Sequence, residues 1–490
     1  MSTNVPKGET LGHPTGLFLL FGTEMWERMS YYGMRGIFVL YLVAFAGNFG
    51  WDMAYFGIDP NAADATKQYD IAIQSHALGI LGVYAFWVYV TPVLGGWIAD
   101  NKWGQRKAII FGGILMMLGQ FALGTPHEFI KGMETEFLYL GLGLLIFGNG
   151  FFKPNISTMV GDLYNEGDKR RDAAFTIFYM GINLGSILGY LVVGSIGEKI
   201  NYQYGFLTAG VGMLLGVLLQ LALSNKYLGK IGVEPSAKQT SGDDVASNKP
   251  LTAEERDRVK VILIMSFFTI MFWLGFEQAA GSFNLFAKYK TDLVFFGWEM
   301  PASWLQMVNP VFVIILAPIF ATVWLKMGAS EPDSPKKFGL GMFFLGLGFV
   351  SMVMAALQIG EVEGAKAHVI WLVMAYVFHT MGELCLSPIG LSLVSKLAPL
   401  KYTSLLMGMW FFFSGVGNYL AAEVGKLVGD VGPLSAFGGV AIMAFISGII
   451  LWLISGKLVD WMHGAEGPAM HDQSEDKVLR EELEDAKGNM

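Results

Sequence analysis

The chain has 490 residues, of which 53% are hydrophobic and only 15% charged, with 62 glycines and a formal net charge of −8. Soluble domains carry about 25% charged residues, so this composition excludes a soluble enzyme and predicts an all-α integral membrane protein. The acidic balance argues against nucleic acid as a partner. The single cysteine, Cys385, excludes a disulfide framework and a cysteine-based metal site.

Apolar runs recur along the chain at about the 20-residue length that crosses a bilayer. The polar N-terminus lacks a basic and apolar signal peptide, so we expect the first run to stay as a helix. We expect 12 transmembrane helices, at about 16–46, 76–99, 108–125, 136–160, 173–197, 203–224, 258–287, 302–325, 338–359, 367–396, 403–427 and 434–459.

A polar, Ser- and Gly-rich stretch at 225–257 separates the first six runs from the last six. If the N-terminus is cytoplasmic, the inner segments hold 23 of the 33 Lys and Arg residues and the outer loops hold 7. The positive-inside rule therefore predicts that both termini are cytoplasmic. The expected organisation is an N-terminal segment (1–15), a six-helix bundle (16–224), a cytoplasmic linker (225–257), a second six-helix bundle (258–459) and an acidic tail (460–490).

Two six-helix bundles with a cytoplasmic linker are the layout of the major facilitator fold, in which the halves rock around a central site. The segment GGWIADNKWGQRK, Gly95 to Lys107, resembles that superfamily's G-x-x-x-D-x-x-G-x-R-K loop. We expect a tight turn at Gly104, with Asp100 either paired with Arg106 or capping a neighbouring helix. The alternative is an ordinary basic inner loop in which the glycine has no special role.

Seven Asp, Glu, Lys or Arg residues lie in the central parts of the predicted helices, away from their ends, where each costs roughly 2.5–3.5 kcal/mol on insertion scales. Such residues usually mark a transport pathway. The bases all belong to the N-terminal half, and two of the acids belong to the C-terminal half, so pairs can form between the bundles. The seven are Glu24, Glu27, Arg28, Arg35, Lys153, Glu277 and Glu383.

The first predicted helix carries the densest polar stripe. Glu24, Arg28, Tyr31 and Arg35 are spaced by 4, 3 and 4 residues, which places them on one helical face. Lipid offers these groups no partners, so we expect the stripe to face a polar cavity. The alternative is a static ladder of buried ion pairs that only fixes the packing of the bundle.

These residues and several later segments resemble the signature motifs of the proton-dependent oligopeptide transporter family. The resemblance spans the predicted helices 1 to 11 and is most specific in helices 1 and 5. The segments are E-x-x-E-R-x-x-Y-Y at Glu24–Tyr32, Y-V-T-P at Tyr89–Pro92, F-F-K-P-N at Phe151–Asn155, F-Y-x-x-I-N-x-G-S at Phe178–Ser186, F-W-x-x-F-E-Q at Phe272–Gln278, N-P at Asn309–Pro310 and G-E-L-x-x-S-P-x-G at Gly382–Gly390.

Two gates follow from the charges and from this resemblance. Lys153 needs a counter-charge, and the resemblance implies that Glu383 supplies it and closes the cytoplasmic side. Arg35 and Glu277 are expected to close the outer side. Breaking either pair leaves a buried charge without its partner, which is costly. A proton can neutralise the acid, and a charged group of the substrate can pair with the base. The pairs therefore offer a route to couple proton movement to substrate binding.

A zwitterionic di- or tripeptide matches the expected cavity. Its carboxylate would lie among the cations and its ammonium would meet Glu383, while Asn183 and Asn309 would hold backbone groups. Aromatic side chains would form roomy walls, although packing between helices is an equal alternative for each. The expected substrate-binding residues are Arg28, Arg35, Tyr31, Tyr32, Tyr89, Lys153, Asn183, Trp273, Asn309, Glu383 and Trp410.

The coupling proton is assigned first to Glu277 and then to Glu24 and Glu27, because a carboxylate with a movable arginine partner can take up and release a proton. His76 lies at the outer start of the second helix and is interpreted as a mouth residue. His379, close to Glu383, is a further candidate for proton handling.

The predicted function is proton-coupled symport of di- and tripeptides by a monomer in the bacterial inner membrane, without a cofactor. The alternative is proton-coupled uptake of another small solute, such as nitrate or a modified peptide. We find no H-E-x-x-H or G-x-x-x-x-G-K-[ST] motif for an enzyme or an ATP-driven pump. The 33 residues of 225–257 are too short and polar for the two extra helices that many bacterial members carry between the halves.

Overall fold

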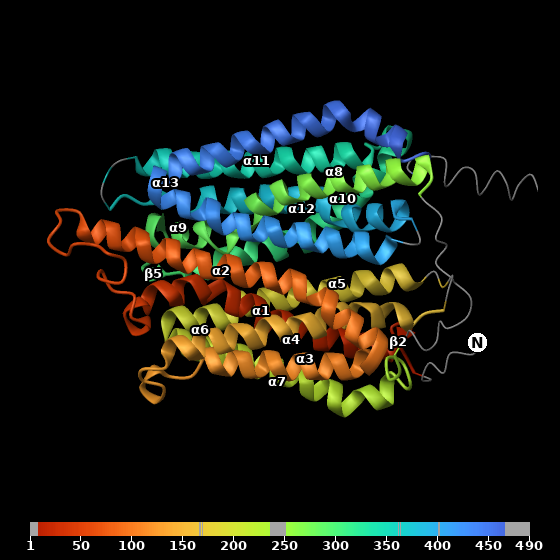
Figure 1. Cartoon of the computed structure of the whole chain (residues 1–490), viewed down its shortest axis with the longest axis horizontal. Coiled ribbons are helices and arrows are strands. Elements are labelled where there is room, and N and C mark those ends of the chain that lie inside the picture. The colour runs from red at the N-terminus through yellow and green to blue at the C-terminus, as the bar shows by residue number, and fades with distance from the viewer. Residues whose placement is uncertain are drawn as a thin grey trace, which may run out of the picture.

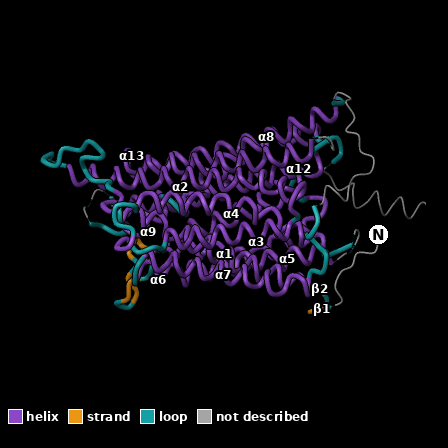
Figure 2. Tube along the Cα trace, turned by 60° about the horizontal axis from the view of Figure 1, so that its bottom comes forward, coloured by secondary structure: helices purple, strands orange, loops and turns teal. Residues whose placement is uncertain are grey.

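The computed structural model describes residues 8–165, 168, 170–235, 251–360, 362, 364–399 and 402–465. Its helices run nearly parallel, with the loops gathered at two ends (Figure 2). The N-terminal and C-terminal halves form two adjacent groups of helices (Figure 1). We call the end that holds β1 and β2 the proximal end, and the opposite end, with α6 and β5, the distal end.

The N-terminal half contains seven α-helices, two π-helical turns and two 3₁₀ turns among its described residues. These are α1 (Thr15–Ala44), η1 (Ala46–Phe49), α2 (Ala65–Ile98), η2 (Ala99–Trp103), α3 (Gln105–Leu123), η3 (His127–Phe129), α4 (Glu134–Asp162), α5 (Arg170–Leu188), η4 (Gly189–Val193), α6 (Gly194–Lys199) and α7 (Tyr202–Tyr227). The segments α5, η4 and α6 are continuous, so they correspond to one predicted helix.

The C-terminal half follows the same plan. Its described elements are α8 (Ala253–Phe276), η6 (Glu277–Ala279), α9 (Ser282–Lys290), η7 (Ala302–Met307), α10 (Val308–Met327), η8 (Gly328–Ser330), α11 (Ser334–Ile359), α12 (Ile370–Leu397) and α13 (Thr403–Trp461). Three short strand pairs lie at the two ends, β1 (Glu9–Thr10) with β2 (His13–Pro14), β3 (Thr291–Asp292) with β6 (Ala367–His368), and β4 (Val294–Phe295) with β5 (Trp298–Glu299).

Ten helical segments of the described chain are long and apolar enough to cross a membrane. The last of them, Leu405–Trp461, is two helices joined at Gly432, whose φ of 81° breaks the helix just before Pro433. The strongly charged α1 is not among the ten. With α1 added and the last segment divided, the structure is consistent with the predicted twelve helices.

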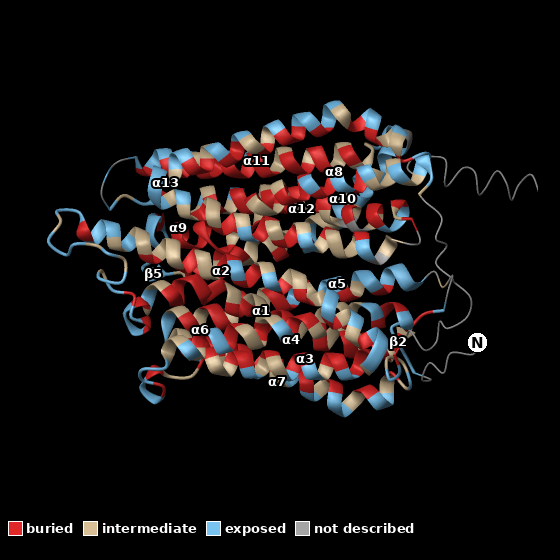
Figure 3. Ribbon diagram, in the orientation of Figure 1, coloured by how far each residue is buried: buried red, intermediate tan, exposed pale blue. Residues whose placement is uncertain are grey.

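The outward surface of this helical assembly is apolar. Buried residues line the inner faces of the helices and exposed residues alternate along the outer ones (Figure 3). The exposed side chains include large hydrophobic ones such as Ile442 and Leu453. A soluble protein rarely exposes apolar area on this scale, so the protein is a multi-pass membrane protein.

Local signals in the sequence define several helix boundaries. Thr252 and Glu255 form a reciprocal capping box at the start of α8. The turn predicted at Gly104 is present, with a φ of 80°.

Arg106, however, does not make the expected pair with Asp100, because its guanidinium donates to Asn225 Oδ1 at 3.2 Å and to the Gly229 carbonyl at 2.6 Å.

Glycines allow α5 and η4 to pack closely on α1. A Cβ at Gly181 would lie 2.8 Å from Phe21 Cδ2, and one at Gly189 would lie 2.7 Å from the Gly33 nitrogen. Between them, a Cβ at Gly185 would lie 2.8 Å from Arg28 Cβ. The four-residue glycine repeat therefore has a packing role, and it fixes the backbone that carries Arg28.

Candidate functional site

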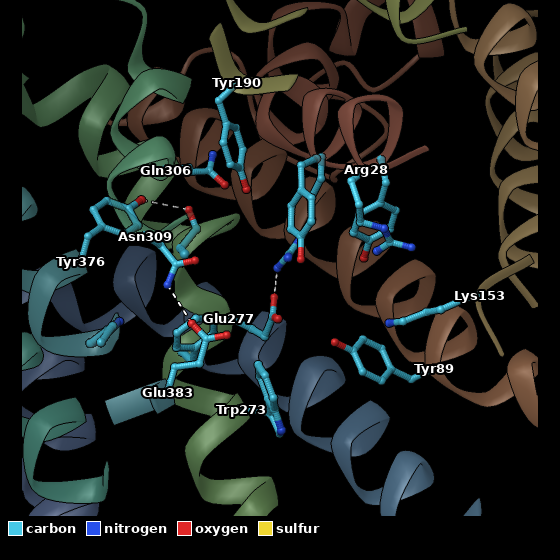
Figure 4. Close-up of a pocket in the computed structure, with 16 residues that line it drawn as sticks. Arg28, Tyr89, Lys153, Tyr190, Trp273, Glu277, Gln306, Asn309, Tyr376 and Glu383 are labelled. Carbon is cyan, nitrogen blue, oxygen red and sulfur yellow. Dashed lines mark hydrogen bonds and ion pairs between the residues drawn. The ribbon is translucent and has the colours of Figure 1, made fainter. Parts of the chain in front are cut away.

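A cavity lies between the two halves and is lined by charged, amide and aromatic side chains (Figure 4). Cations from the N-terminal half lie on one side of it, and amide and carboxylate groups from the C-terminal half lie on the other. Its lining consists of Arg28, Tyr31, Tyr32, Arg35, Tyr89, Lys153, Tyr190, Trp273, Phe276, Glu277, Ala279, Gln306, Asn309, Tyr376, His379 and Glu383.

Arg28 is held in place by two glutamates of its own helix that do not line the cavity. Its Nε lies 2.9 Å from Glu24 Oε1 and also pairs with Glu27, and all three side chains are buried. The guanidinium lies 5.2 Å from the ring centroid of Tyr31, within cation–π range. The two carboxylates, which do not line the cavity, thus fix the position of Arg28, and the part of Arg28 that lines the cavity stays available to a ligand.

Arg35 and Glu277 form an ion pair across the interface between the halves. Arg35 belongs to α1, whereas Glu277 opens η6, at the point where α8 ends. This is the pair expected at the outer gate, and both partners also line the cavity. A charge entering the cavity can therefore reach the pair directly.

Lys153 and Glu383 lie on opposite sides of the cavity and are not paired in the described structure (Figure 4). Lys153 Nζ lies 4.8 Å from the ring centroid of Tyr89, on its own half. Glu383 Oε2 instead accepts a hydrogen bond of 2.8 Å from Asn309 Nδ2, which also donates to Thr380 Oγ1 at 3.0 Å. The expected pair is therefore separated, and each member interacts with groups of its own half, Lys153 with Tyr89, Glu24 and Glu27 and Glu383 with Asn309.

Polar contacts between the halves gather towards the distal end. Besides the Arg35–Glu277 pair, Asn284 Nδ2 donates to the Gly36 carbonyl at 2.8 Å. Further towards the distal end, Glu198 of α6 accepts hydrogen bonds from the start of η7. The distal ends of the two halves are thus joined while the Lys153–Glu383 pair, further towards the proximal end, is apart.

Comparisons with known proteins identify the family. The family model for the POT family matches residues 106–241 and 224–433, which together span more than half of the chain. The chain belongs to the POT family. Its members are secondary transporters rather than enzymes.

Similar proteins match this POT-family chain over nearly its whole length. The uncharacterized transporter YclF of Bacillus subtilis (strain 168) is 35% identical, with 94% of this chain and 97% of that protein covered. The di-/tripeptide transporter of Lactococcus lactis subsp. cremoris is 32% identical, with 92% and 97% covered. A crystal structure of a mutant of the peptide transporter POT in complex with alafosfalin is 35% identical, with a TM-score of 0.82 and coverage of 94% and 98%.

Ten of the predicted site residues of this POT-family protein line the cavity, and four do not. Glu24 and Glu27 pair with Arg28, as described above. Asn183 is buried in α5, where its Nδ2 donates to the Tyr179 carbonyl at 2.9 Å. Trp410 is also buried and packs on Gly390, with its ring centroid 6.3 Å from that of Phe338. In this structure Trp410 is thus a packing residue, which was the alternative for each aromatic.

Sequence reasoning missed several lining residues that helical spacing could have found. Each lies three or seven residues from a residue that was predicted and therefore on the same helical face. Phe276 follows Trp273 by three, Gln306 precedes Asn309 by three, and Tyr376 precedes Glu383 by seven. His379, the further candidate for proton handling, also lines the cavity.

His76 lies outside this cavity, in an aromatic cluster towards the distal end. Its ring centroid lies 4.5 Å from that of Trp51, and it also contacts Tyr55 and Phe56. This placement agrees with the interpretation of His76 as a mouth residue.

Proposed function

We propose that this POT-family protein carries di- and tripeptides into the cell together with protons, by alternating access of the central cavity. The observation that carries the proposal is the pattern of charges across the cavity. Arg28, Arg35 and Lys153 face it from one half, and Glu277 and Glu383 face it from the other. A peptide zwitterion has one charge for each side.

The proposed binding mode follows from which partners are available. The peptide carboxylate lies near Lys153, which lines the cavity and makes no ion pair with Glu383. The peptide ammonium meets Glu383, and Asn309 orients that carboxylate. Tyr31, Tyr32 and Trp273 contribute amphipathic walls that tolerate different side chains. The relatives named as peptide transporters support the same substrate class.

Proton coupling is proposed to act at the Arg35–Glu277 pair. Protonation of Glu277 removes the charge that holds Arg35, and the freed Arg35 then joins Lys153 in binding the peptide carboxylate. The pair therefore opens at the lowest cost when a proton and a peptide are both present. Glu24 and Glu27 are the next candidates, through their contact with Arg28.

We further propose that the distal end faces the outside of the bacterial inner membrane and that both termini are cytoplasmic. The excess of Lys and Arg in the segments at the proximal end supports this orientation. In this orientation, the intact Arg35–Glu277 pair corresponds to a cavity closed to the outside, and the separated Lys153–Glu383 pair to one open to the cytoplasm. We propose that the transport unit is a monomer, because the two halves of one chain supply both charged sides of the cavity.

Uptake of labelled dialanine into proteoliposomes tests the function. We expect concentrative uptake under an inward proton gradient, its collapse with a proton ionophore, and competition by other di- and tripeptides but not by free alanine. Equilibration without concentration would remove proton coupling. Absence of uptake by a folded, monodisperse preparation would favour another small solute, such as nitrate or a modified peptide.

A further inference from the structure

Outside the cavity, a second set of contacts joins the halves at the distal end. Glu198 lies in α6 at the end of the N-terminal half, and its side chain is only 1% exposed. Its two carboxylate oxygens accept hydrogen bonds from the backbone nitrogens of Ala302 at 3.0 Å and Ser303 at 2.8 Å. These are the first residues of η7, which continues into α10 as one helical segment, Ala302–Met327. A side chain of one half therefore caps a membrane helix of the other half.

The charges around this contact favour it. Lys288, near the end of α9, places Nζ 3.4 Å from Glu198 Oε2. A carboxylate at a helix N-terminus also interacts favourably with the helix dipole. Hydrogen bonds in which the acceptor is charged are about twice as strong as neutral ones. Glu198 thus satisfies two backbone donors and one cation that all belong to the opposite half.

Neighbouring groups extend the contact over one helical turn. Trp304 Nε1 donates to Ser195 Oγ at 3.0 Å, again between η7 and α6. Gly194 lies directly against Ser303, where any larger residue would collide with the serine side chain. The two backbones therefore approach closely, and Ser303 is fully buried between them.

We infer that Glu198 is a distal latch, which holds the two halves together at this end independently of the substrate. The inference rests on the proposed alternating access. None of the groups that Glu198 contacts lines the cavity. A peptide in the cavity can replace a partner of Arg35 or Glu277, but it cannot replace a partner of Glu198. The latch therefore sets the equilibrium between molecules that are closed and molecules that are open at the distal end. The Arg35–Glu277 pair, in contrast, responds to the ligand.

The latch can be tested by the rate at which a buried cysteine is alkylated in purified protein without peptide. Ser303→Cys is nearly isosteric and reports separation of η7 from α6. Asn284→Cys reports separation of α9 from α1, where Asn284 contacts Gly36. Both reporters are placed singly in a Cys385→Ala background. Alkylation of a buried site proceeds through transiently open molecules, so its rate follows their population.

Glu198→Ala is expected to accelerate alkylation at both reporters by about tenfold, since it removes two charge-assisted hydrogen bonds and one ion pair. Glu198→Gln, which keeps one acceptor oxygen, is expected to give a smaller acceleration. Glu299→Gln is the matched control, because Glu299 pairs with Lys199 at the same end but is exposed and 3.7 Å away. This control is expected to leave both rates unchanged.

Unchanged rates in Glu198→Ala would overturn the latch. Acceleration of Ser303→Cys alone would also overturn it, because the effect would then be local loosening of η7. If Glu198→Ala does not yield folded protein, Glu198→Gln and Trp304→Phe carry the same test. The assay needs neither peptide nor a proton gradient, so its result is independent of whether dialanine is transported.

Discussion

At the scale of single residues, Glu383 differs from the other carboxylates at the cavity in having only neutral partners. Asn309 donates to it, and no described cation lies within ion-pair distance. Its negative charge is therefore available to a ligand. Glu24, Glu27 and Glu277 are all engaged with arginines.

Substitution Glu383→Gln should therefore weaken binding of peptides that carry a free ammonium. Loss of one charge-assisted hydrogen bond costs about 1.5–3 kcal/mol, so we expect roughly 10- to 100-fold weaker binding of dialanine. N-acetyl-dialanine, which lacks the ammonium, is the matched ligand and should bind the parent and the variant with similar affinity. Titration calorimetry with both ligands measures the difference. An equal loss of affinity for both ligands would contradict this role of Glu383.

Glu277→Gln should separate proton coupling from substrate exchange. The neutral amide cannot take up a proton, whereas the cavity and its cations remain. We expect proton-driven accumulation of dialanine to be lost, while peptide counterflow in proteoliposomes continues at a reduced rate. Glu423→Gln is the control, because Glu423 pairs with Lys426 within one helix and outside the cavity. Undiminished accumulation in Glu277→Gln would rule out Glu277 as the coupling residue.

At the scale of secondary structure elements, the site depends on how closely α5 approaches α1. Gly185 contacts the backbone of Met25 and the Cβ of Arg28, so the position has no room for a side chain. Gly439 on α13 has no atom within 4 Å of the place that its Cβ would occupy. The two glycines therefore offer a matched comparison of a packed and an open position.

Gly185→Ala should destabilise the protein and displace Arg28, whereas Gly439→Ala should be neutral. Overpacking typically costs about 1–3 kcal/mol, which lowers the thermal midpoint by several degrees. Thermal unfolding of the detergent-purified variants, followed by tryptophan fluorescence, measures the stability. Dialanine uptake should fall in Gly185→Ala alone. Equal midpoints for the two variants would show that α5 can move away from α1 without cost.

The sequence predicted the elements more completely than the contacts of individual side chains. Hydrophobic runs located the helices because a bilayer imposes a uniform length and apolar character. The charges also identified most of the cavity, since lipid cannot accommodate them. The sequence could not show that Trp410 packs in the core while other aromatic residues line the cavity, because an aromatic side chain is equally suited to both places. Tyr376 and Gln306 carry no charge, and only their spacing from Glu383 and Asn309 linked them to the site.

At the scale of the whole molecule, a sequence can predict which pairs are possible but not which of them coexist. Lys153–Glu383 and Arg35–Glu277 join the same two halves at different depths. If the halves rock as rigid bodies, closing one end opens the other. The structure holds Arg35–Glu277 together and Lys153–Glu383 apart, which is the arrangement expected for one of two alternating states.

Rigid-body rocking predicts that loosening the distal pair brings the proximal ends together. Ser157 and Ser387 lie one helical turn beyond Lys153 and Glu383 towards the proximal end, on the same helical faces of α4 and α12. The double variant Ser157→Cys and Ser387→Cys, in a Cys385→Ala background, therefore reports proximal closure through a short bifunctional cross-linker. Adding Glu277→Gln should raise the cross-linking rate several-fold, although Glu277 belongs to neither α4 nor α12.

The control for this coupling is Glu423→Gln in the same reporter background, and its cross-linking rate should match that of the parent. Because the reporters and Glu277 lie on different elements, a faster rate requires that the distal change moves the halves as units. An unchanged rate in Glu277→Gln would mean that the distal pair opens locally, without movement at the proximal end. The two gates would then act independently, and the alternation between them would have to arise from ligand binding alone.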